Sequence, residues 1–231
     1  MPSEPLFRLP ASPALPVLGH DGTYPVRRIF CVGRNYAAHA AEMGAEVDRE
    51  APFYFTKSPA AICLSGSVIG YPPGSEDCHY EMELVVALGA SVFEGEAGQA
   101  LNAVFGYGCG IDLTRRDLQA EAKQARRPWD LGKDFENAAI VAPLTPADAA
   151  GDMSDGHIRL EHDGRIVQDA RLSDMVWSVP EIIAHLSRFY HLGPGDLIFT
   201  GTPAGVGPVR PGSRLRGVVE GLTPVEVDIA G

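Results

Sequence analysis

Short apolar runs, each bounded by glycine, proline or polar residues, recur along most of the chain. Their short lengths and their content of β-branched and aromatic side chains favour strands. The runs that meet both conditions are 27–33, 52–57, 67–71, 79–89, 103–111, 196–201 and 225–229. Two further alternating segments flank Asp163-Gly164, and this dipeptide indicates a tight hairpin between them.

Three segments instead have the spacing or composition of helices. Residues 35–44 are rich in alanine, and Asn35 is of a type that caps helix starts. Residues 114–125 begin with Thr114, which stands in a capping position before a run of helix-forming residues. Residues 179–192 have a proline in the first turn and a glycine directly after the last residue, as helices favour.

Many strands, few helices and no regular alternation of the two predict a β-rich α+β fold rather than a doubly wound one. The first 25 residues are rich in proline, and we interpret 1–25 as an N-terminal arm. The remaining residues, 26–231, are then expected to form one larger domain.

Two carboxylates interrupt the apolar pattern at the start of the 79–89 run. Because strand side chains alternate between faces, Glu81 and Glu83 share a face with Val85 and Ala87 and lie about 7 Å apart. Two interpretations are open: a solvated strand end, which is common, or a site for a divalent cation that prefers oxygen ligands, Mg²⁺ or Mn²⁺. Like charges this close repel, so the second interpretation needs a third ligand.

Other polar residues are candidates for the same site. Asp112 follows the glycine-rich 103–111 run, where it could be held rigidly or could simply form a turn. In the helix after it, Arg116, Gln119 and Lys123 share one face. A solvated face is the ordinary explanation, and for Lys123 we prefer it. Lys133 is an isolated lysine in the segment PWDLGKDF.

His39 and Glu42 lie three residues apart in the first helical segment and can meet as an acid–base pair. The same spacing is also a common surface feature, so it does not decide a function by itself. Motifs of several other enzyme classes are not matched. GYGCGID lacks the spacing of a dinucleotide fingerprint, TGTPAGVG lacks the lysine of a P-loop, and there is no G-x-S-x-G motif.

The formal net charge of −11 over 231 residues argues against nucleic acid or an anionic membrane surface as a partner. Hydrophobic residues make up 45% and charged residues 21%, which is ordinary for a protein that buries a core. No apolar run is long enough to span a membrane, and the proline-containing start does not fit a signal peptide. The four cysteines form no C-x-x-C pair, which favours reduced thiols and a cytoplasmic location over disulfides or zinc.

The candidate residues fall in motif-like segments spread from about residue 25 to the C-terminus. These segments are CVGRNYAAHAAEMG, FTKS, HYEMELVVALG, GYGCGIDLTRRDLQ, RPWDLGKDF and LIFTGTPAGVGPV. In type and in order they resemble the fumarylacetoacetate hydrolase family, and RNYAAHAAEM and PWDLGK look closest to its acylpyruvate hydrolases. One departure is that Lys57 is followed by Ser58 where relatives often have proline, so Lys57 is not counted among the implied site residues.

The resemblance implies a role for each candidate residue. It implies that Mg²⁺, with Mn²⁺ or Ca²⁺ as substitutes, is bound by Glu81, Glu83 and Asp112. It implies that a water-activating dyad and an electrostatic stabiliser are formed by His39 and Glu42 and by Lys133. It implies that the substrate is contacted by Arg34, Arg116, Gln119 and Thr202.

The resemblance also has implications for the fold and assembly. It implies the mixed β-roll of the family's C-terminal domain, here over 26–231, and a homodimer. The segment 34–50, which contains the dyad, would be a lid that is mobile without ligand and orders over a bound 2-oxo acid.

The implied activity is hydrolysis of a carbon–carbon bond in a 2,4-dioxo acid (an acylpyruvate), with fumarylpyruvate as the favoured substrate and fumarate and pyruvate as products. Two alternatives within the family are decarboxylation of oxaloacetate and isomerisation of an unsaturated 2-oxo acid. A binding module that keeps the fold and metal is a third alternative, against which the His39–Glu42 pair argues. The expected partner is a small molecule, not nucleic acid or a membrane.

Overall fold

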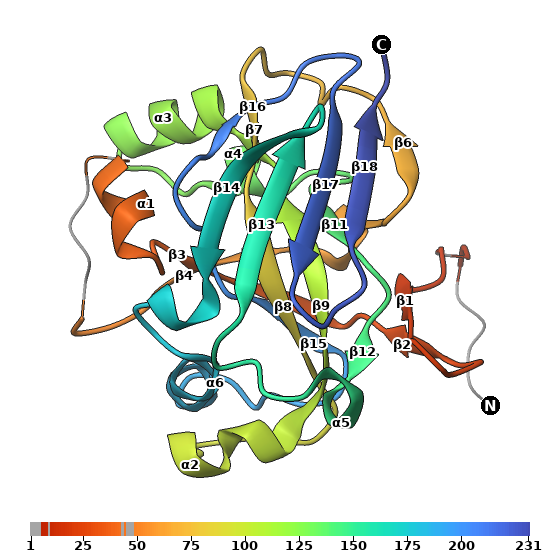
Figure 1. Ribbon diagram of the computed structural model, residues 1–231, viewed down its shortest axis with the longest axis vertical. Coiled ribbons are helices and arrows are strands. Elements are labelled where there is room, and N and C mark those ends of the chain that lie inside the picture. The colour runs from red at the N-terminus through yellow and green to blue at the C-terminus, as the bar shows by residue number, and fades with distance from the viewer. Residues whose placement is uncertain (1–5, 9, 43, 45–48) are drawn as a thin grey trace.

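The structure, a computed structural model, describes residues 6–8, 10–42, 44 and 49–231 (Figure 1). Its largest sheet has eight strands and mixes parallel and antiparallel pairs. Seven of them follow one another in the order β4 (Phe53–Lys57), β3 (Arg28–Gly33), β15 (Asp196–Phe199), β8 (Met82–Leu88), β9 (Val104–Asp112), β11 (Ala139–Val141) and β5 (Ile62–Leu64). The eighth strand, β12 (Thr145–Pro146), pairs with β9.

A second sheet has five strands, in the order β14 (Arg165–Arg171), β13 (His157–His162), β17 (Arg214–Val219), β18 (Val225–Ile229) and β6 (Ser67–Ile69). A small three-stranded sheet consists of β10 (Thr114–Arg115), β7 (Cys78–Tyr80) and β16 (Gly207–Pro208). The last pair is a hairpin of β1 (Ala14–Pro16) and β2 (Thr23–Pro25).

The helices are short and lie around the sheets (Figure 1). The α-helices are α1 (Ala37–Glu42), α2 (Ala97–Ala100), α3 (Arg116–Gln124), α4 (Asp130–Lys133), α5 (Ala147–Ala150) and α6 (Val179–Ser187). Single 3₁₀ turns occur at η1 (Pro59–Ala61), η2 (Leu101–Ala103) and η3 (Leu172–Asp174).

The two large sheets pack face to face, with the five-stranded sheet in front of β8 and β9 in Figure 1. Strand β8 is buried at every position, as expected for a strand covered on both faces. Gly217 of β17 lies close against β8, since a Cβ atom there would lie 2.2 Å from the sulfur of Met82. A larger side chain at position 217 would have to displace the side chains of Met82 and Val225, so the glycine allows this close packing.

The hairpin of β1 and β2 packs on the larger domain. The Tyr24 hydroxyl donates to the backbone oxygens of Leu88 and Asp196, and Leu15 is fully buried. The predicted division into an arm at 1–25 and a domain at 26–231 stays a prediction, because the packing of this hairpin is compatible with either an arm or an integral part of the domain.

The observed elements confirm the predicted β-rich α+β class. The hairpin at Asp163-Gly164 is also confirmed, since both residues have positive φ (52° and 75°), as a two-residue turn of this type requires. One strand prediction was wrong. The 79–89 run is divided at Glu81, because β7 pairs within the small sheet while β8 enters the large one.

Two capping predictions were also wrong. Asn35 does not cap α1; its amide bonds the backbone of Trp177 and the oxygen of Thr200. Thr114 lies in β10 rather than at the start of α3. Both side chains are used in tertiary contacts, which a local pattern cannot reveal. Of the predicted lid, positions 43 and 45–48 lie outside the described residues.

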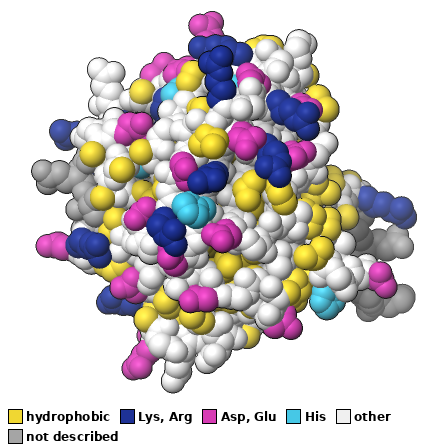
Figure 2. Space-filling model, in the orientation of Figure 1, with side chains coloured by type: hydrophobic (Ala, Val, Ile, Leu, Met, Phe, Trp, Pro, Cys, Tyr) yellow, Lys and Arg dark blue, Asp and Glu magenta, His cyan; other side chains and the backbone are white. Residues whose placement is uncertain are grey.

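On the face seen in Figure 2, acidic and basic side chains are interspersed with small hydrophobic groups. Within the described residues, no helix is both long enough and apolar enough to cross a membrane.

Candidate active site

Three buried carboxylates converge where β7 passes into β8. Glu81 is the residue between these strands, and Asp112 ends the neighbouring antiparallel strand β9. The backbone N–H of Asp112 donates to the carbonyl oxygen of Glu81 (2.8 Å), so the two residues are direct cross-strand neighbours. Glu83, in β8, lies two residues after Glu81. One carboxylate oxygen from each of the three lies within 4.8 Å of those of the other two.

Lys133 lies between two of these carboxylates. It is the last residue of α4, and its Nζ donates to Glu81 (2.6 Å), Asp112 (2.9 Å) and Thr114 Oγ1 (2.6 Å). The close approach of α4 to α3 depends on Gly132, because a Cβ atom there would lie 3.1 Å from the backbone of Gln119. A glycine one residue before Lys133 therefore allows the ammonium group to reach the carboxylates.

Two further cations complete the cluster. Lys57, from β4, forms an ion pair with Asp112 (2.8 Å) and is fully enclosed. Arg116, at the start of α3, donates to Glu81 (2.5 Å) and to the side-chain oxygen of Gln119 (2.6 Å). The resemblance did not settle a role for Lys57, and the structure places it in direct contact with a candidate metal ligand.

The electrostatics differ between the two glutamates. Burial alone would raise the pKa of Glu81, but the charges of Lys133 and Arg116 outweigh it and hold that pKa well below its usual range. Burial raises the pKa of Glu83, and the negative charges of Asp112 and Glu81 raise it further. The pKa of Lys133 is raised because Asp112 and Glu81 outweigh its burial.

This difference fits a divalent cation. Within the part of the chain that the structure describes, Glu83 has no ion-pair partner, and its recorded hydrogen bond is from the N–H of Gly201 (2.6 Å). A buried carboxylate with raised pKa beside two others is stabilised in its charged form by a cation among them. The three ligands are all carboxylates, the donor type preferred by Mg²⁺ and Mn²⁺.

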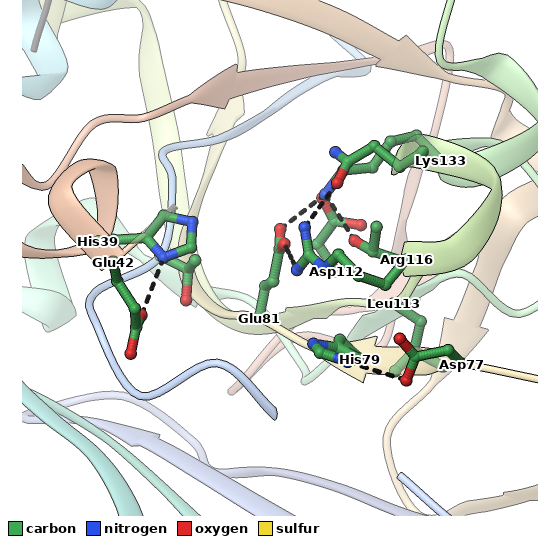
Figure 3. Close-up of polar contacts among 12 residues, drawn as sticks. His39, Glu42, Asp77, His79, Glu81, Asp112, Leu113, Arg116 and Lys133 are labelled. Carbon is green, nitrogen blue, oxygen red and sulfur yellow. Dashed lines mark hydrogen bonds and ion pairs between the residues drawn. The ribbon is translucent and has the colours of Figure 1, made fainter. Parts of the chain in front are cut away.

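The His39–Glu42 pair lies on the opposite side of Glu81 from Arg116 and Lys133 (Figure 3). The Nδ1 atom of His39 lies 3.5 Å from a carboxylate oxygen of Glu42, which also accepts bonds from the N–H of Gly205 (3.2 Å). His39 is buried, and burial lowers its pKa although Glu81 and Glu42 act in the other direction.

One pocket connects the carboxylates to this pair. A volume of about 40 Å³ within it is open to a water-sized molecule. Its lining contains eight of the ten residues that the sequence suggested: Arg34, His39, Glu81, Glu83, Arg116, Gln119, Lys133 and Thr202. The other two, Glu42 and Asp112, contact the lining residues His39 and Lys133. Aromatic residues Phe55 and Trp129 form part of the wall.

Sequence reasoning missed Gln168, a buried residue of β14. Its side-chain oxygen accepts from the N–H of Met82 (3.0 Å), and its amide donates to Thr202 Oγ1 (2.9 Å) and to the oxygen of Pro203. It thus holds the backbone beside Glu81 against the turn that carries Thr202. The sequence does show a polar residue at an inward-facing strand position, which was the available signal. It does not show which segment this residue would contact.

The preference for a solvated Lys123 was incomplete, because Lys123 is exposed but also lines the pocket. The alternation argument placed Glu81 and Glu83 on one strand face. The structure instead brings them together across a break between two sheets.

A β-rich domain with a buried triad of oxygen ligands beside a His–Glu pair defines a class of metal-dependent enzyme. The family model for the C-terminal domain of fumarylacetoacetate (FAA) hydrolase matches residues 28–230. The chain therefore belongs to the fumarylacetoacetate hydrolase family, as the sequence resemblance implied.

Two relatives illustrate the similarity. The chain is 44% identical over 189 residues to a fumarylpyruvate hydrolase from a Ralstonia species, covering 81% of this chain and 98% of the relative. A crystal structure of fumarylpyruvate hydrolase from Pseudomonas aeruginosa, in complex with Mn²⁺ and pyruvate, superposes with a TM-score of 0.94 at 44% identity, covering 98% and 99% of the two chains. The predicted family fold is thereby confirmed.

A third relative has a different activity. The chain is 36% identical over 199 residues to an oxaloacetate tautomerase from Escherichia coli, covering 86% of this chain and 90% of the relative. Family membership alone therefore does not determine which reaction of a 2-oxo acid is catalysed, and the geometry of the site has to be considered.

Proposed function

We propose that the protein is a metal-dependent hydrolase that cleaves the carbon–carbon bond of acylpyruvates, with fumarylpyruvate as its favoured substrate. The observation that carries the proposal is one pocket lined by Glu81, Glu83 and His39. Asp112 completes the carboxylate triad and Glu42 completes the pair with His39. The three carboxylates suit a divalent ion that would bind a 2-oxo acid. The His–Glu pair suits the activation of water.

The triad would hold Mg²⁺, for which Mn²⁺ or Ca²⁺ could substitute. When bound, a divalent ion polarises the 2-oxo acid and stabilises negative charge on its oxygens. The chain's own residues do the rest. Arg116, Gln119 and Thr202 face the same pocket and would orient the substrate there, with Gln168 holding the Thr202 hydroxyl in place.

His39 would act as the base. Its Nδ1 faces Glu42, which leaves Nε2 free to take a proton from water. The Glu42 carboxylate, held by the N–H of Gly205, would stabilise the protonated ring. The hydroxide adds to the distal carbonyl carbon, C4, and the C3–C4 bond then breaks. The bonding pair moves to C3 of a pyruvate enolate, which gains a proton to become pyruvate, while the acyl group leaves as a carboxylate.

Lys133 would stabilise the enolate charge. Its ammonium group is buried, and its pKa is raised, so it stays positive throughout the reaction. In a water-poor pocket, a fixed positive charge beside the developing negative one lowers the barrier more than the same charge in water would.

Several coarser features complete the proposal. We expect a homodimer, as the family resemblance implies, and a small-molecule substrate as the partner. The buried, unpaired cysteines Cys31, Cys63, Cys78 and Cys109 suit a reducing cytoplasm.

Oxaloacetate is the second candidate substrate, and its decarboxylation needs no activated water. The similarity to an oxaloacetate tautomerase favours keeping it, since the carboxylate triad could serve either reaction. Isomerisation of an unsaturated 2-oxo acid is a third candidate. The His39–Glu42 pair favours hydrolysis over decarboxylation, because of these two reactions only hydrolysis needs a base.

The test is turnover of purified protein on fumarylpyruvate, acetylpyruvate and oxaloacetate, each with Mg²⁺, with Mn²⁺ and with chelator. We expect metal-dependent hydrolysis of fumarylpyruvate at the highest kcat/KM of the three. Faster reaction of oxaloacetate than of either acylpyruvate would overturn the proposal in favour of the second candidate.

A further inference from the structure

Two positively charged side chains line the mouth of the pocket. Arg34 and Lys123 are both exposed and both belong to the pocket lining. Within the described part of the chain, neither forms an ion pair with a carboxylate. The other cations of the pocket differ, since Lys133 and Arg116 are bound to Glu81.

Arg34 has an unusual backbone conformation and one aromatic contact. Its φ of 59° is left-handed, which is uncommon for a residue other than glycine. Its guanidinium lies 5.7 Å from the ring centre of Phe53, and that ring packs 4.9 Å from Trp129, which also lines the pocket. A cation–π contact of this kind leaves the N–H groups of the guanidinium available to an anion.

The position of Lys123 follows from the helix. Arg116, Gln119 and Lys123 lie on one face of α3 at spacings of three and four residues, and all three line the pocket. Partial burial lowers the pKa of Lys123, and the positive charges of Arg34 and Arg116 lower it further. Like charges gathered at the mouth of a pocket are stabilised by an anion between them.

The charge balance of the pocket floor points to the same conclusion. Glu81, Glu83 and Asp112 face the floor cations Lys57 and Lys133 together with Arg116. A bound divalent ion therefore leaves an excess of two positive charges. These charges attract the carboxylate and enol oxygens at the pyruvate end of a substrate. Once the pyruvate end is held on the floor, the acyl end extends towards the mouth, where Arg34 and Lys123 lie.

We propose that Arg34 and Lys123 form a second carboxylate subsite, which selects acylpyruvates with a carboxylate at the far end of the acyl group. Lys123 is then a specificity-determining residue. This inference rests on the proposed acylpyruvate hydrolysis and extends it to the residues that read the acyl group. Acetylpyruvate, which lacks the distal carboxylate, makes no use of this subsite.

The kinetic test compares fumarylpyruvate with acetylpyruvate in the wild type and in Lys123→Gln. We expect kcat/KM for fumarylpyruvate to fall about tenfold, the size of one charge-assisted contact at a partly exposed site, with acetylpyruvate unchanged. Lys123→Arg should retain the preference. The matched control is Arg126→Gln, which removes the same charge three residues away at a position outside the pocket lining.

An equal loss for both substrates in Lys123→Gln, or the same loss of preference in Arg126→Gln, would overturn the inference. The former would mean that Lys123 supports the whole site, and the latter that only the overall field matters. The subsite is supported if only Lys123→Gln loses the preference for fumarylpyruvate over acetylpyruvate. In that variant kcat/KM for fumarylpyruvate should also depend less on salt concentration.

A binding measurement separates this inference from the proposed function. Fumarate and crotonate differ only in the distal carboxylate, and their binding to the Mg²⁺-loaded protein is followed by calorimetry. We expect fumarate to bind about tenfold more tightly in the wild type and no more tightly than crotonate in Lys123→Gln. If no acylpyruvate is turned over, the proposed function fails, and this difference still decides the subsite. Equal binding of the two acids by the wild type refutes the subsite.

Discussion

The floor of the pocket and its outer part differ in how far their charged side chains are buried. We define the floor as Glu81, Glu83, Asp112, Lys57 and Lys133. We define the outer part as Arg34, His39, Glu42 and Lys123. On the floor every charged side chain is buried, and Lys133 alone makes three hydrogen bonds. In the outer part, Arg34, Glu42 and Lys123 are exposed.

This difference in burial corresponds to two different roles in the proposed reaction. Buried carboxylates are costly unless they are paired, and Lys57 and Lys133 supply such partners to Asp112 and Glu81. The outer groups are on short α1, on α3 and in a loop, where exposure makes movement cheap. Metal binding and charge stabilisation belong to the first region. Proton transfer and reading of the acyl group belong to the second.

Replacing one glutamate in each region gives the largest expected contrast. Glu83→Gln should abolish nearly all turnover and lower Mg²⁺ affinity by more than the about 10- to 100-fold that loss of a supporting residue costs. The fold should survive, because the Gly201 N–H can donate to the amide oxygen and a buried charge is removed. Calorimetric titration with Mg²⁺ measures the affinity, and thermal melts of the metal-free protein measure the stability.

The matched control is Glu42→Gln, in which the same chemical change is made at a side chain that is 41% exposed. It should bind Mg²⁺ as the wild type does. Wild-type affinity in Glu83→Gln would remove the triad from the proposal.

The second contrast replaces one lysine in each region by methionine. Lys133→Met leaves Glu81 and Asp112 buried without their shared cation and should cost about 3–5 kcal/mol of unfolding free energy. Lys123→Met, at the exposed mouth, should change stability by no more than about 0.5 kcal/mol. Urea denaturation at fixed pH measures both. Mg²⁺ should restore part of the loss in Lys133→Met alone, and similar losses in the two variants would contradict the division into floor and outer part.

The same division explains what could be predicted from the sequence. Strands were found wherever a run was apolar and bounded by turn residues, and the motifs together pointed to Glu81, Glu83 and Asp112. The break at Glu81 was not predictable, because local alternation continues through it while the strand partners change from β10 and β16 to β9 and β15.

Contacts between segments that are distant in the sequence could not be predicted either. Lys57 reaches Asp112 from β4, a strand that is not next to β9, and Gln168 reaches Thr202 from the second sheet. Thr114 looked like a helix cap because its local spacing fits one, yet its hydroxyl binds Lys133. Patterns report which face a residue occupies, whereas these roles depend on which elements meet.

A third prediction concerns the base in the outer part. His39→Ala should lower acylpyruvate hydrolysis about 10²-fold or more, the usual contribution of general-base catalysis. Decarboxylation of oxaloacetate should fall less, because it needs no activated water. Steady-state kinetics on both substrates, at saturating Mg²⁺, test this. If both activities fall equally, the histidine supports the pocket rather than activating water.

The smallest expected effect is a shift in the pH profile. Burial lowers the pKa of His39 below its ordinary value of 6.5, and Glu42 partly opposes this. A base must be unprotonated, so kcat/KM should rise with pH through a midpoint below 6.5. Glu42→Gln removes an influence that raises this pKa, and the midpoint should move to still lower pH. An unchanged midpoint would mean that another group, such as a metal ligand, sets the acid limb.

The same shift predicts the sign of a stability change. Because the folded-state pKa of His39 lies below the unfolded value, the unfolded chain binds more protons between the two pKa values. The contribution of His39 to stability is therefore fully present above about pH 6.5 and falls as the pH drops through that value. His39→Gln, which cannot titrate, should lose less stability between pH 7 and pH 5 than the wild type. Urea denaturation at both pH values measures the difference, and an equal loss in the two proteins would show that His39 is not the group that titrates.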